Sequence, residues 1–284
     1  MNNINEITIA HSPDSDDAFM FYALAHDKLK LKNLKIKQVL KDIQSLNEEA
    51  RIGKYEITAL SFAAYPYVMD KYYLMPCGAS VGDKYGPILV AKDGVKLNNI
   101  ENLKIGIPGK LTTAFLALSI YNPNLQVVEM PFDKIMAAVV NDEIDAGLLI
   151  HEGQLTYQDF NLVNLLDLGM WWYEETKLPL VLGGNVIRKD LDPELIQELT
   201  LLLRNAIVYS LSNRQEALDY ALTFARDMNP GLADKFVGMY VNDYTVDYGD
   251  TGRLAIQTLF EYANHKGLFK QKILPEFVKL TVKS

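Results

Sequence analysis

Cysteine, histidine and long apolar runs are scarce in this sequence. Cys77 is the only cysteine among 284 residues, so no disulfide can form within the chain. The four histidines lack the spacings that are typical of metal ligands, so we expect no metal site. No run approaches the roughly 20 apolar residues of a membrane-spanning helix. The start of the chain, MNNINEITIAHSPDSDD, lacks the basic and apolar regions of a signal peptide, which predicts a cytoplasmic protein.

Basic residues are also too few for a general nucleic-acid binder. The chain has 28 Lys and Arg against 36 Asp and Glu, which gives a formal net charge of −8. Contacts to a phosphate backbone need clustered cations, so we expect no nucleic-acid partner and no membrane partner. The GxSxG, GxGxxG and GxxxxGK[ST] motifs are absent as well. A small molecule is therefore the partner that the composition leaves open.

The sequence does contain the alternation of an α/β protein. Hydrophobic residues make up 49% of the chain, and short apolar runs alternate with longer helical patterns. The expected strands of the first part are Ile7–Ala10, Leu34–Leu40, Ile57–Leu60, Tyr72–Met75 and Ile88–Ala91. Those of the second part are Lys104–Ile107, Gln126–Met130, Asp145–Ile150 and Leu162–Leu166. After about Asp192 the pattern predicts four helices.

This order favours two lobes joined by two crossings. The amide and glycine content of Asp93–Asn102 and of Gly183–Asn185 suits segments that pass between lobes. We therefore expect lobe I to contain residues 1–93 and 186–284, and lobe II to contain residues 94–185. Ligands of open α/β sheets bind outside the carboxyl ends of the strands, so the ligand should lie in the cleft between the lobes.

Two polar segments follow strands of the first lobe. The first, HSPDSDD, supplies Ser12 and Asp16 as candidate ligand-binding residues, and Asp16 or Asp17 could instead cap the helix that follows. Ser61 ends another strand and could either donate to a ligand or cap a helix. Position alone does not decide between binding and capping in either case.

A third segment, GIPGKLTT, joins a strand to a helix in the second lobe. Free backbone N–H groups at a helix start, together with two hydroxyls, suit a carboxylate or a phosphate. The candidates are Gly109, Thr112 and Thr113, and a simple capping role remains the alternative.

The fourth segment, DAGLLIHEG, ends a strongly apolar strand in a histidine. Imidazole titrates near neutral pH, so His151 is a candidate general base. The alternative is a histidine that only makes structural hydrogen bonds. His11 could also line the cleft, whereas His26 and His265 fit helix ends or the surface.

Several of these motifs together resemble the 1,4-dihydroxy-6-naphthoate synthase family. The resemblance runs from about Ile7 to about Leu268 and is carried by SPDSDDAFMFYAL, LSFAAYPYV, GIPGKLTTAFLAL, AGLLIHEGQLTY and DLGMWW. It implies a fold like that of type II periplasmic binding proteins, with both termini in one lobe. It also implies cleavage of cyclic dehypoxanthine futalosine to 1,4-dihydroxy-6-naphthoate on the futalosine route to menaquinone. The enzyme would be a carbon–carbon lyase without a metal or organic cofactor.

The resemblance also implies roles for individual residues. The histidine of the HE segment, His151 here, would be the base, and Ser61, Thr112 and Thr113 would bind the substrate. One motif departs from the family, because SPDSDDAF stands where the family has SPCPNDTF. Asp14 thus replaces a cysteine, and Asp16 an asparagine. Two other functions fit the same fold: a solute-binding protein for a small organic anion, and a ligand sensor.

Overall fold

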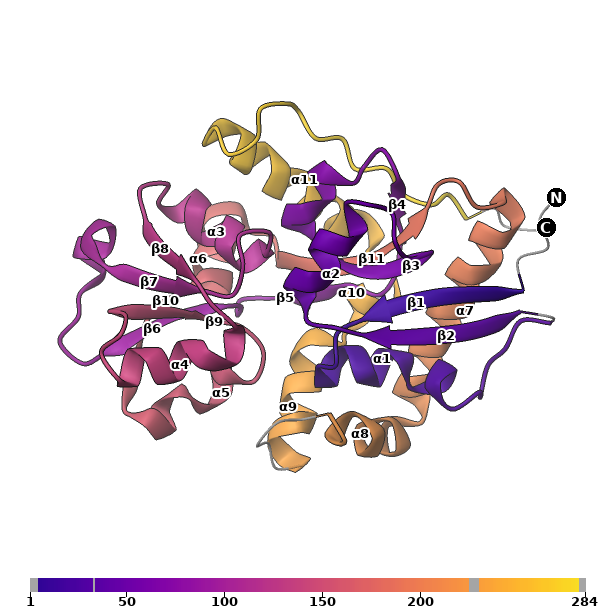
Figure 1. The fold of residues 1–284 in the computed structure, drawn as a ribbon, viewed down its shortest axis with the longest axis horizontal. Helices are drawn as coiled ribbons and strands as arrows, with labels where there is room; N and C mark the ends of the chain where they lie inside the picture. Colours follow the sequence, from indigo (N-terminus) through magenta and orange to yellow (C-terminus); the bar gives the residue numbers. More distant parts are fainter. Residues whose placement is uncertain (1–4, 33, 225–229, 281–284) are drawn as a thin grey trace.

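The chain folds around two β-sheets that lie side by side (Figure 1). The computed structural model describes residues 5–32, 34–224 and 230–280. The strand order is β2-β1-β3-β11-β4 in the first sheet, where β5 also pairs with β11, and β10-β6-β9-β7-β8 in the second. We call the first sheet with helices α1, α2 and α7–α9 lobe I, and the second sheet with α3–α6 lobe II.

The first sheet consists of β1 (Glu6–His11), β2 (Lys35–Leu40), β3 (Ile57–Ser61), β4 (Tyr72–Leu74), β5 (Ser80–Gly82) and β11 (Leu180–Arg188). β1 pairs in parallel with β2 and β3, whereas β11 is antiparallel to β3, β4 and β5. All five residues of β3 are buried, as expected for a central strand that is covered on both faces. Because β1 and β3 are parallel neighbours, their carboxyl ends lie at the same edge of the sheet.

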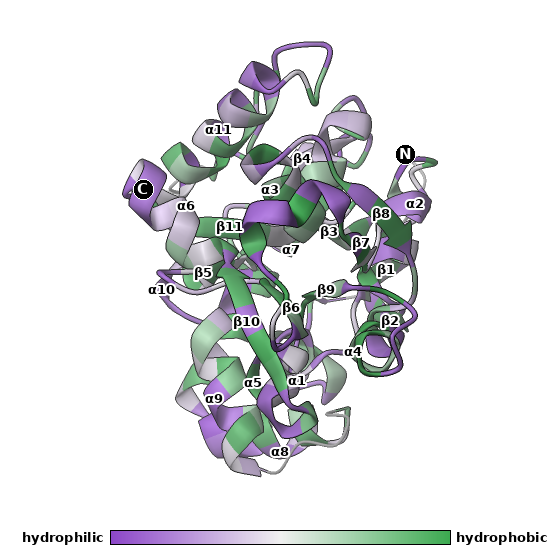
Figure 2. Cartoon of the chain, turned by 90° about the vertical axis from the view of Figure 1, so that its left-hand side faces the viewer, coloured by the Kyte–Doolittle hydropathy of each residue, from purple (hydrophilic) through white to green (hydrophobic). Residues whose placement is uncertain are grey.

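The second sheet consists of β6 (Ile88–Lys92), β7 (Lys104–Ile107), β8 (Gln126–Glu129), β9 (Ala146–Leu149) and β10 (Leu162–Asp167). β7 is parallel to β8 and β9, and β6 is antiparallel to β9 and β10. Hydrophobic residues make up most of β6 and much of β10 (Figure 2). The carboxyl ends of β7 and β9 lead into the GIPGKLTT and HEG segments, as the sequence predicted.

Helices cover both sheets. They are α1 (Ser15–Ala25), α2 (Ile43–Ala50), α3 (Thr113–Tyr121), α4 (Phe132–Val140), α5 (Gly153–Thr156), α6 (Leu168–Thr176), α7 (Pro193–Ser212), α8 (Arg214–Leu222), α9 (Pro230–Tyr240), α10 (Asp243–Val246) and α11 (Gly249–His265). Single 3₁₀ segments span Phe62–Tyr67, Leu97–Asn102 and Tyr157–Phe160. The helices α7, α8 and α9 pack against α1, and α11 packs against β11 and α3. Within the described part of the chain, no helix combines the length and the apolarity needed to cross a membrane.

The strand pairing differs from the expected lobe boundaries at both crossings. β6 was expected in lobe I but pairs within the second sheet, and the whole of β11 pairs within the first. The glycines of Gly183–Asn185 suggested a break, yet these residues form ladder pairs with Ser61, Leu60 and Ala59. We therefore propose that the chain divides between β5 and β6 and again before β11, rather than at residues 93/94 and 185/186.

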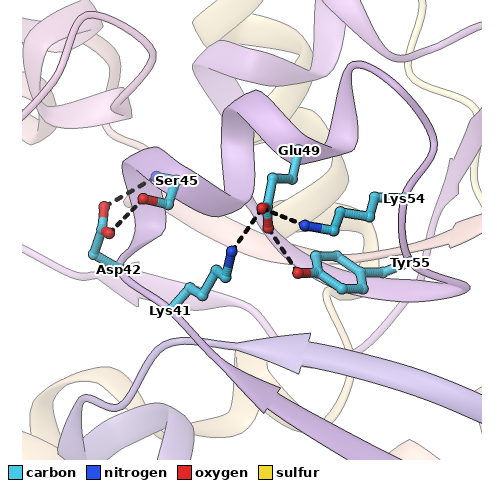
Figure 3. A network of polar contacts seen from close by, with 6 residues as sticks. All are labelled: Lys41, Asp42, Ser45, Glu49, Lys54 and Tyr55. Carbon is cyan, nitrogen blue, oxygen red and sulfur yellow. Dashed lines mark hydrogen bonds and ion pairs between the residues drawn. The ribbon is translucent and has the colours of Figure 1, made fainter.

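The helix that follows β2 is held in place by a network of charges (Figure 3). The carboxylate of Glu49 accepts from Lys41 at 2.6 Å, from Lys54 at 2.5 Å and from the Tyr55 hydroxyl at 2.7 Å. Partial burial opposes ionisation of Glu49, but these three donors outweigh it and lower its pKa to about 2. Asp42 caps the helix by accepting from Ser45 N at 2.9 Å. This network fixes α2, which carries Asn47 to the cleft.

Candidate functional site

A cavity lies between the two lobes, at the ends of the strands that the sequence singled out. It encloses about 710 Å³, including its opening to solvent. Lobe I lines it with Ser12, Asp16, Asp17, Ser61, Ser80 and Tyr240. Lobe II lines it with Thr112, Thr113, Ala114, His151 and Gln154. Apolar surface comes from Ile43, Leu60, Pro87, Ile150, Leu182 and Phe236. An amphiphilic organic molecule suits such a lining.

Of the residues proposed from the sequence, all but Gly109 line this cavity. The backbone at Gly109 has φ of 153°, and an added Cβ would lie 2.3 Å from Oε1 of Gln44. Gln44 belongs to α2 of lobe I and its Oε1 accepts from Leu111 N at 3.3 Å. Gly109 therefore allows the loop before α3 to approach lobe I closely, which is a structural need rather than a contact to the cavity.

The start of α3 combines capping with exposure to the cavity. Thr112 is the N-cap, and its Oγ1 donates to Gly109 O at 2.8 Å and accepts from Phe115 N at 3.3 Å. Thr113 and Ala114, the first residues of the helix, both line the cavity. The first N–H groups of a helix have no intrahelical acceptor and carry the positive end of its dipole. This end of the cavity is therefore suited to a carboxylate.

The hydroxyl of Thr113 joins the two lobes. It donates to the carbonyl oxygen of Leu182 at 2.5 Å and accepts from Ala63 N, in lobe I, at 3.1 Å. Both of these partners are backbone groups of lobe I. The side chain of Thr113 thus connects the two lobes.

Ser61 is held by a residue that the sequence did not single out. Asn47 donates from Nδ2 to Ser61 Oγ at 3.0 Å and accepts from Ser61 N at Oδ1 at 2.9 Å. The same Nδ2 group reaches Leu111 O across the lobes at 3.2 Å. Because Ser61 Oγ accepts from Asn47, its own hydrogen is left to donate toward the cavity. Asn47 is fully buried in α2. In the sequence, the only signal is an amide side chain within a predicted helix.

Part of the cavity wall is acidic, because Asp16 and Asp17 line it. Burial, followed by the neighbouring charges of Asp17 and Asp14, raises the pKa of Asp16 to about 7. Burial likewise raises the pKa of Asp17 to about 6, against a hydrogen bond from Ser12 N that measures 2.8 Å. Ser80 donates to Asp16 Oδ2 at 3.0 Å. Asp16 is therefore a carboxyl that exchanges its proton near neutral pH. Asp17 was considered only as a helix cap, but it too lines the cavity.

The actual N-cap of α1 is Asp14 rather than Asp16 or Asp17. Its backbone is extended, with φ of −83° and ψ of 157°, but its side chain makes no capping hydrogen bond. The carboxylate instead reaches across the cleft, where Oδ2 lies 3.3 Å from Nε2 of His151. The capping prediction for this helix was therefore placed two residues too late.

His151 lies two residues after the end of β9, in a left-handed backbone conformation with φ of 57°. Residues other than glycine adopt this region seldom, and such strain gathers at functional sites. The conformation turns the chain from β9 into α5. The imidazole packs edge-on against Phe132 with ring centroids 4.8 Å apart, and 16% of the side chain is exposed. It is thus accessible from the cavity but held by its surroundings.

His11, which could have lined the cleft, lies outside the cavity, and so do Cys77 and Trp172. The ring of His11 is completely buried and stacks on Phe21 at 4.2 Å, and burial lowers its pKa. Burial also raises the pKa of the Cys77 thiol to about 12, which leaves it unreactive near neutral pH. Trp172 is buried in the core beside Trp171 and is not positioned to stack on a ligand in this cavity.

The chain is similar to known proteins over most of its length. The sequence profile of the menaquinone biosynthesis family matches residues 7–265. The chain is 37% identical to the 1,4-dihydroxy-6-naphthoate synthase of Thermus thermophilus over 96% of its length and 99% of the relative's. It is 32% identical to the synthase of Streptomyces coelicolor, covering 92% and 94% of the two chains.

Solved structures of other proteins also resemble this chain. A crystal structure of an Archaeoglobus fulgidus protein superposes with a TM-score of 0.90 and 45% identity, over 94% of this chain and all of that one. The alkanesulfonate-binding protein of Xanthomonas axonopodis pv. citri shares only 11% identity but superposes with a TM-score of 0.72, over 97% and 98% of the two chains. This second likeness concerns the fold alone, and it confirms the predicted periplasmic-binding-protein-like architecture. The profile and the two curated relatives go further: the chain belongs to the menaquinone biosynthesis family, as the resemblance of its motifs predicted.

Proposed function

We propose that this chain is a 1,4-dihydroxy-6-naphthoate synthase, a lyase that cleaves a carbon–carbon bond of cyclic dehypoxanthine futalosine. The two curated relatives match it over nearly their whole length, which supports a shared reaction. The observation that carries the proposal in this chain is the cavity. The start of α3, Ser61 and His151 all line this one space, whose other residues are largely apolar, and this supports the proposal.

The cavity has two chemically different ends, and these orient the substrate. The carboxylate of the substrate lies against the first N–H groups of α3, at Thr113 and Ala114. The fused rings occupy the apolar surface between Leu60, Ile150 and Leu182. The polar sugar part then extends toward the acidic wall, where carboxyl groups can accept hydrogen bonds from its hydroxyls.

His151 acts on the sugar part as the general base. The imidazole takes a proton from the sugar part, and the carbon–carbon bond then breaks. The electron pair of that bond moves into the ring system that becomes the naphthoate, and the sugar part leaves as a separate fragment. Ser61 donates its free hydrogen to a polar group of the substrate. The two lobes hold the reacting bond against the imidazole and keep water out. The reaction is proposed to need no metal or organic cofactor and to take place in the cytoplasm.

The direct test is incubation of the chain with cyclic dehypoxanthine futalosine and detection of the products by mass. We expect turnover to 1,4-dihydroxy-6-naphthoate. In His151→Gln and His151→Ala, turnover should fall by about 10²–10⁴-fold while binding is retained, since a positioned base contributes about that much. His265→Gln, on the exposed end of α11, is the matched control and should behave like the wild type. Tight binding without any turnover by the wild type would instead identify a solute-binding protein.

A further inference from the structure

We propose that Asp14 is a positioning residue for His151: its carboxylate accepts a hydrogen bond from the Nε2–H group across the cleft, so that Nδ1 is left as the proton acceptor. This inference rests on the proposed function, because it assigns His151 the role of base. It goes beyond that function because it names the group that orients the base and the ring nitrogen that takes the proton.

The first observation is the use that the structure makes of the Asp14 side chain. An aspartate at an N-cap normally accepts a hydrogen bond from the second or third N–H of its own helix. Asp14 is the N-cap of α1 and makes no such bond. Its Oδ2 lies instead 3.3 Å from Nε2 of His151, and both side chains are largely buried, at 8% and 16% exposure. The carboxylate is therefore directed at the imidazole at the expense of the helix end.

The second observation is that the imidazole has little freedom. The left-handed backbone at His151 fixes the direction in which its side chain leaves the main chain. The ring of Phe132 contacts the imidazole edge-on at 4.8 Å. With Asp14 on Nε2, the ring is held by its backbone, by an aromatic edge and by a carboxylate. A carboxylate that accepts from one imidazole nitrogen fixes the tautomer and leaves the lone pair on the other.

Other acidic groups surround the imidazole, but none matches the contact of Asp14. Asp16, Asp17 and Glu152 all interact electrostatically with His151. Asp16 accepts from the Ser80 hydroxyl and Asp17 from the backbone of Ser12. Of these groups, only Asp14 forms an ion pair with the imidazole within 4.0 Å. The surrounding carboxyls add negative charge, and Asp14 orients the imidazole.

The contact also joins the two lobes. Asp14 is the N-cap of α1 in lobe I, whereas His151 lies just after β9 of lobe II. The imidazole is consequently oriented only while the lobes lie against each other in this arrangement. Asp14 is one of the positions where SPDSDDAF departs from the motif of the resembling family, so the resemblance does not imply this pair.

The experiment compares Asp14→Asn and Asp14→Ala with the wild type. We expect kcat to fall about 10–100-fold with KM within about threefold, because orientation is lost while the binding surface remains. Asp70→Asn, an exposed aspartate paired with Lys71, is the control and should leave both measurements unchanged.

A readout that does not need turnover separates this inference from the proposed function. The ¹⁵N shifts of the His151 imidazole in the unliganded chain should indicate the Nε2–H tautomer, and Asp14→Ala should give a mixture of tautomers. Unchanged shifts and unchanged kcat in both Asp14 variants, together with lost turnover in His151→Gln, would overturn the inference but keep His151 as the base. Full turnover in His151→Gln would remove the base itself, whatever the shifts indicate. If Asp14→Ala does not fold, Asp14→Asn decides alone.

Discussion

The hydroxyl of Tyr240 in α9 donates a 2.7 Å hydrogen bond to Oε1 of Gln154 in α5, and this bond connects lobe I to lobe II. Both side chains line the cavity and both are buried, at 2% and 8% exposure. Thr113, which also lines the cavity, and Asn47 connect the lobes through backbone groups. Several contacts between the lobes are thus made by residues of the cavity wall.

Tyr240→Phe should loosen the lobes. The change removes one donor and leaves a buried amide oxygen unsatisfied, which costs about 1–3 kcal/mol. We expect a higher KM and a larger radius of gyration of the unliganded chain by small-angle X-ray scattering. Tyr67→Phe, on a half-exposed ring, is the control. An unchanged KM in Tyr240→Phe would mean that this contact plays no part in closing the cavity.

Thr113→Val should act on stability, because it removes a hydroxyl that satisfies two backbone groups. The carbonyl of Leu182 and the N–H of Ala63 would lose their partner, and the free energy of unfolding should fall by about 1–3 kcal/mol. Thr113→Ser keeps the hydroxyl and serves as the control. Denaturant titration measures the effect. A rise in KM without any loss of stability would show that the hydroxyl contacts the substrate instead.

Asp16→Asn should change how stability depends on pH. The pKa of Asp16 is raised from 3.8 to about 7 in the folded chain, so its contribution is fully present below pH 3.8 and is lost as the pH rises toward 7. Above pH 7 the variant should be more stable than the wild type, by at most about 4 kcal/mol at 1.4 kcal/mol per pH unit. The measurement is denaturant unfolding between pH 4 and pH 8.

Asp70→Asn gives the opposite sign and is the control for this test. Lys71 lowers the pKa of Asp70, so the contribution of that carboxylate is present above its unfolded pKa and is lost in acid. If Asp16→Asn has the same pH dependence as the wild type, the carboxyl is ionised in the folded chain at neutral pH.

Gly184→Ala should destabilise the wall of the cavity. A Cβ at this position would lie 2.3 Å from the Tyr248 hydroxyl and 3.2 Å from Cζ of Phe62, all in the packed interior. Overpacking of this kind costs about 1–3 kcal/mol. The Tyr248 hydroxyl is buried and has no hydrogen-bond partner among the described residues.

Tyr248→Phe should therefore rescue Gly184→Ala. Removing the hydroxyl makes room for the new methyl group and breaks no hydrogen bond, so the double variant should unfold at a higher denaturant concentration than Gly184→Ala alone. If the losses in unfolding free energy of Gly184→Ala and Tyr248→Phe simply add in the double variant, the Tyr248 hydroxyl is not the source of the strain.

Much of the architecture is encoded locally and could be predicted. The apolar run of Ile57–Leu60 and the alternation of strands and helices fix an α/β fold, because period and burial are properties of neighbouring residues. The strand ends that carry Ser61, Thr112 and His151 could be found for the same reason, since strand, turn and helix follow one another in the chain. The family resemblance was likewise carried by short motifs.

Only the tertiary structure decided which of these groups act together. The expected lobe boundaries differ from the strand pairing, because β6 pairs with β9 and β10, and β11 with β3, β4 and β5, which are partners distant in the chain that no local pattern encodes. The close approach of Gln44 from the other lobe, which requires glycine at position 109, is likewise visible only in the tertiary structure. Asn47 and Asp14 were missed as site residues because their partners, Ser61, Leu111 and His151, are 14 to 137 residues away in the chain. The sequence determined the pieces of the cavity wall, and the packing of one lobe against the other determined their contacts.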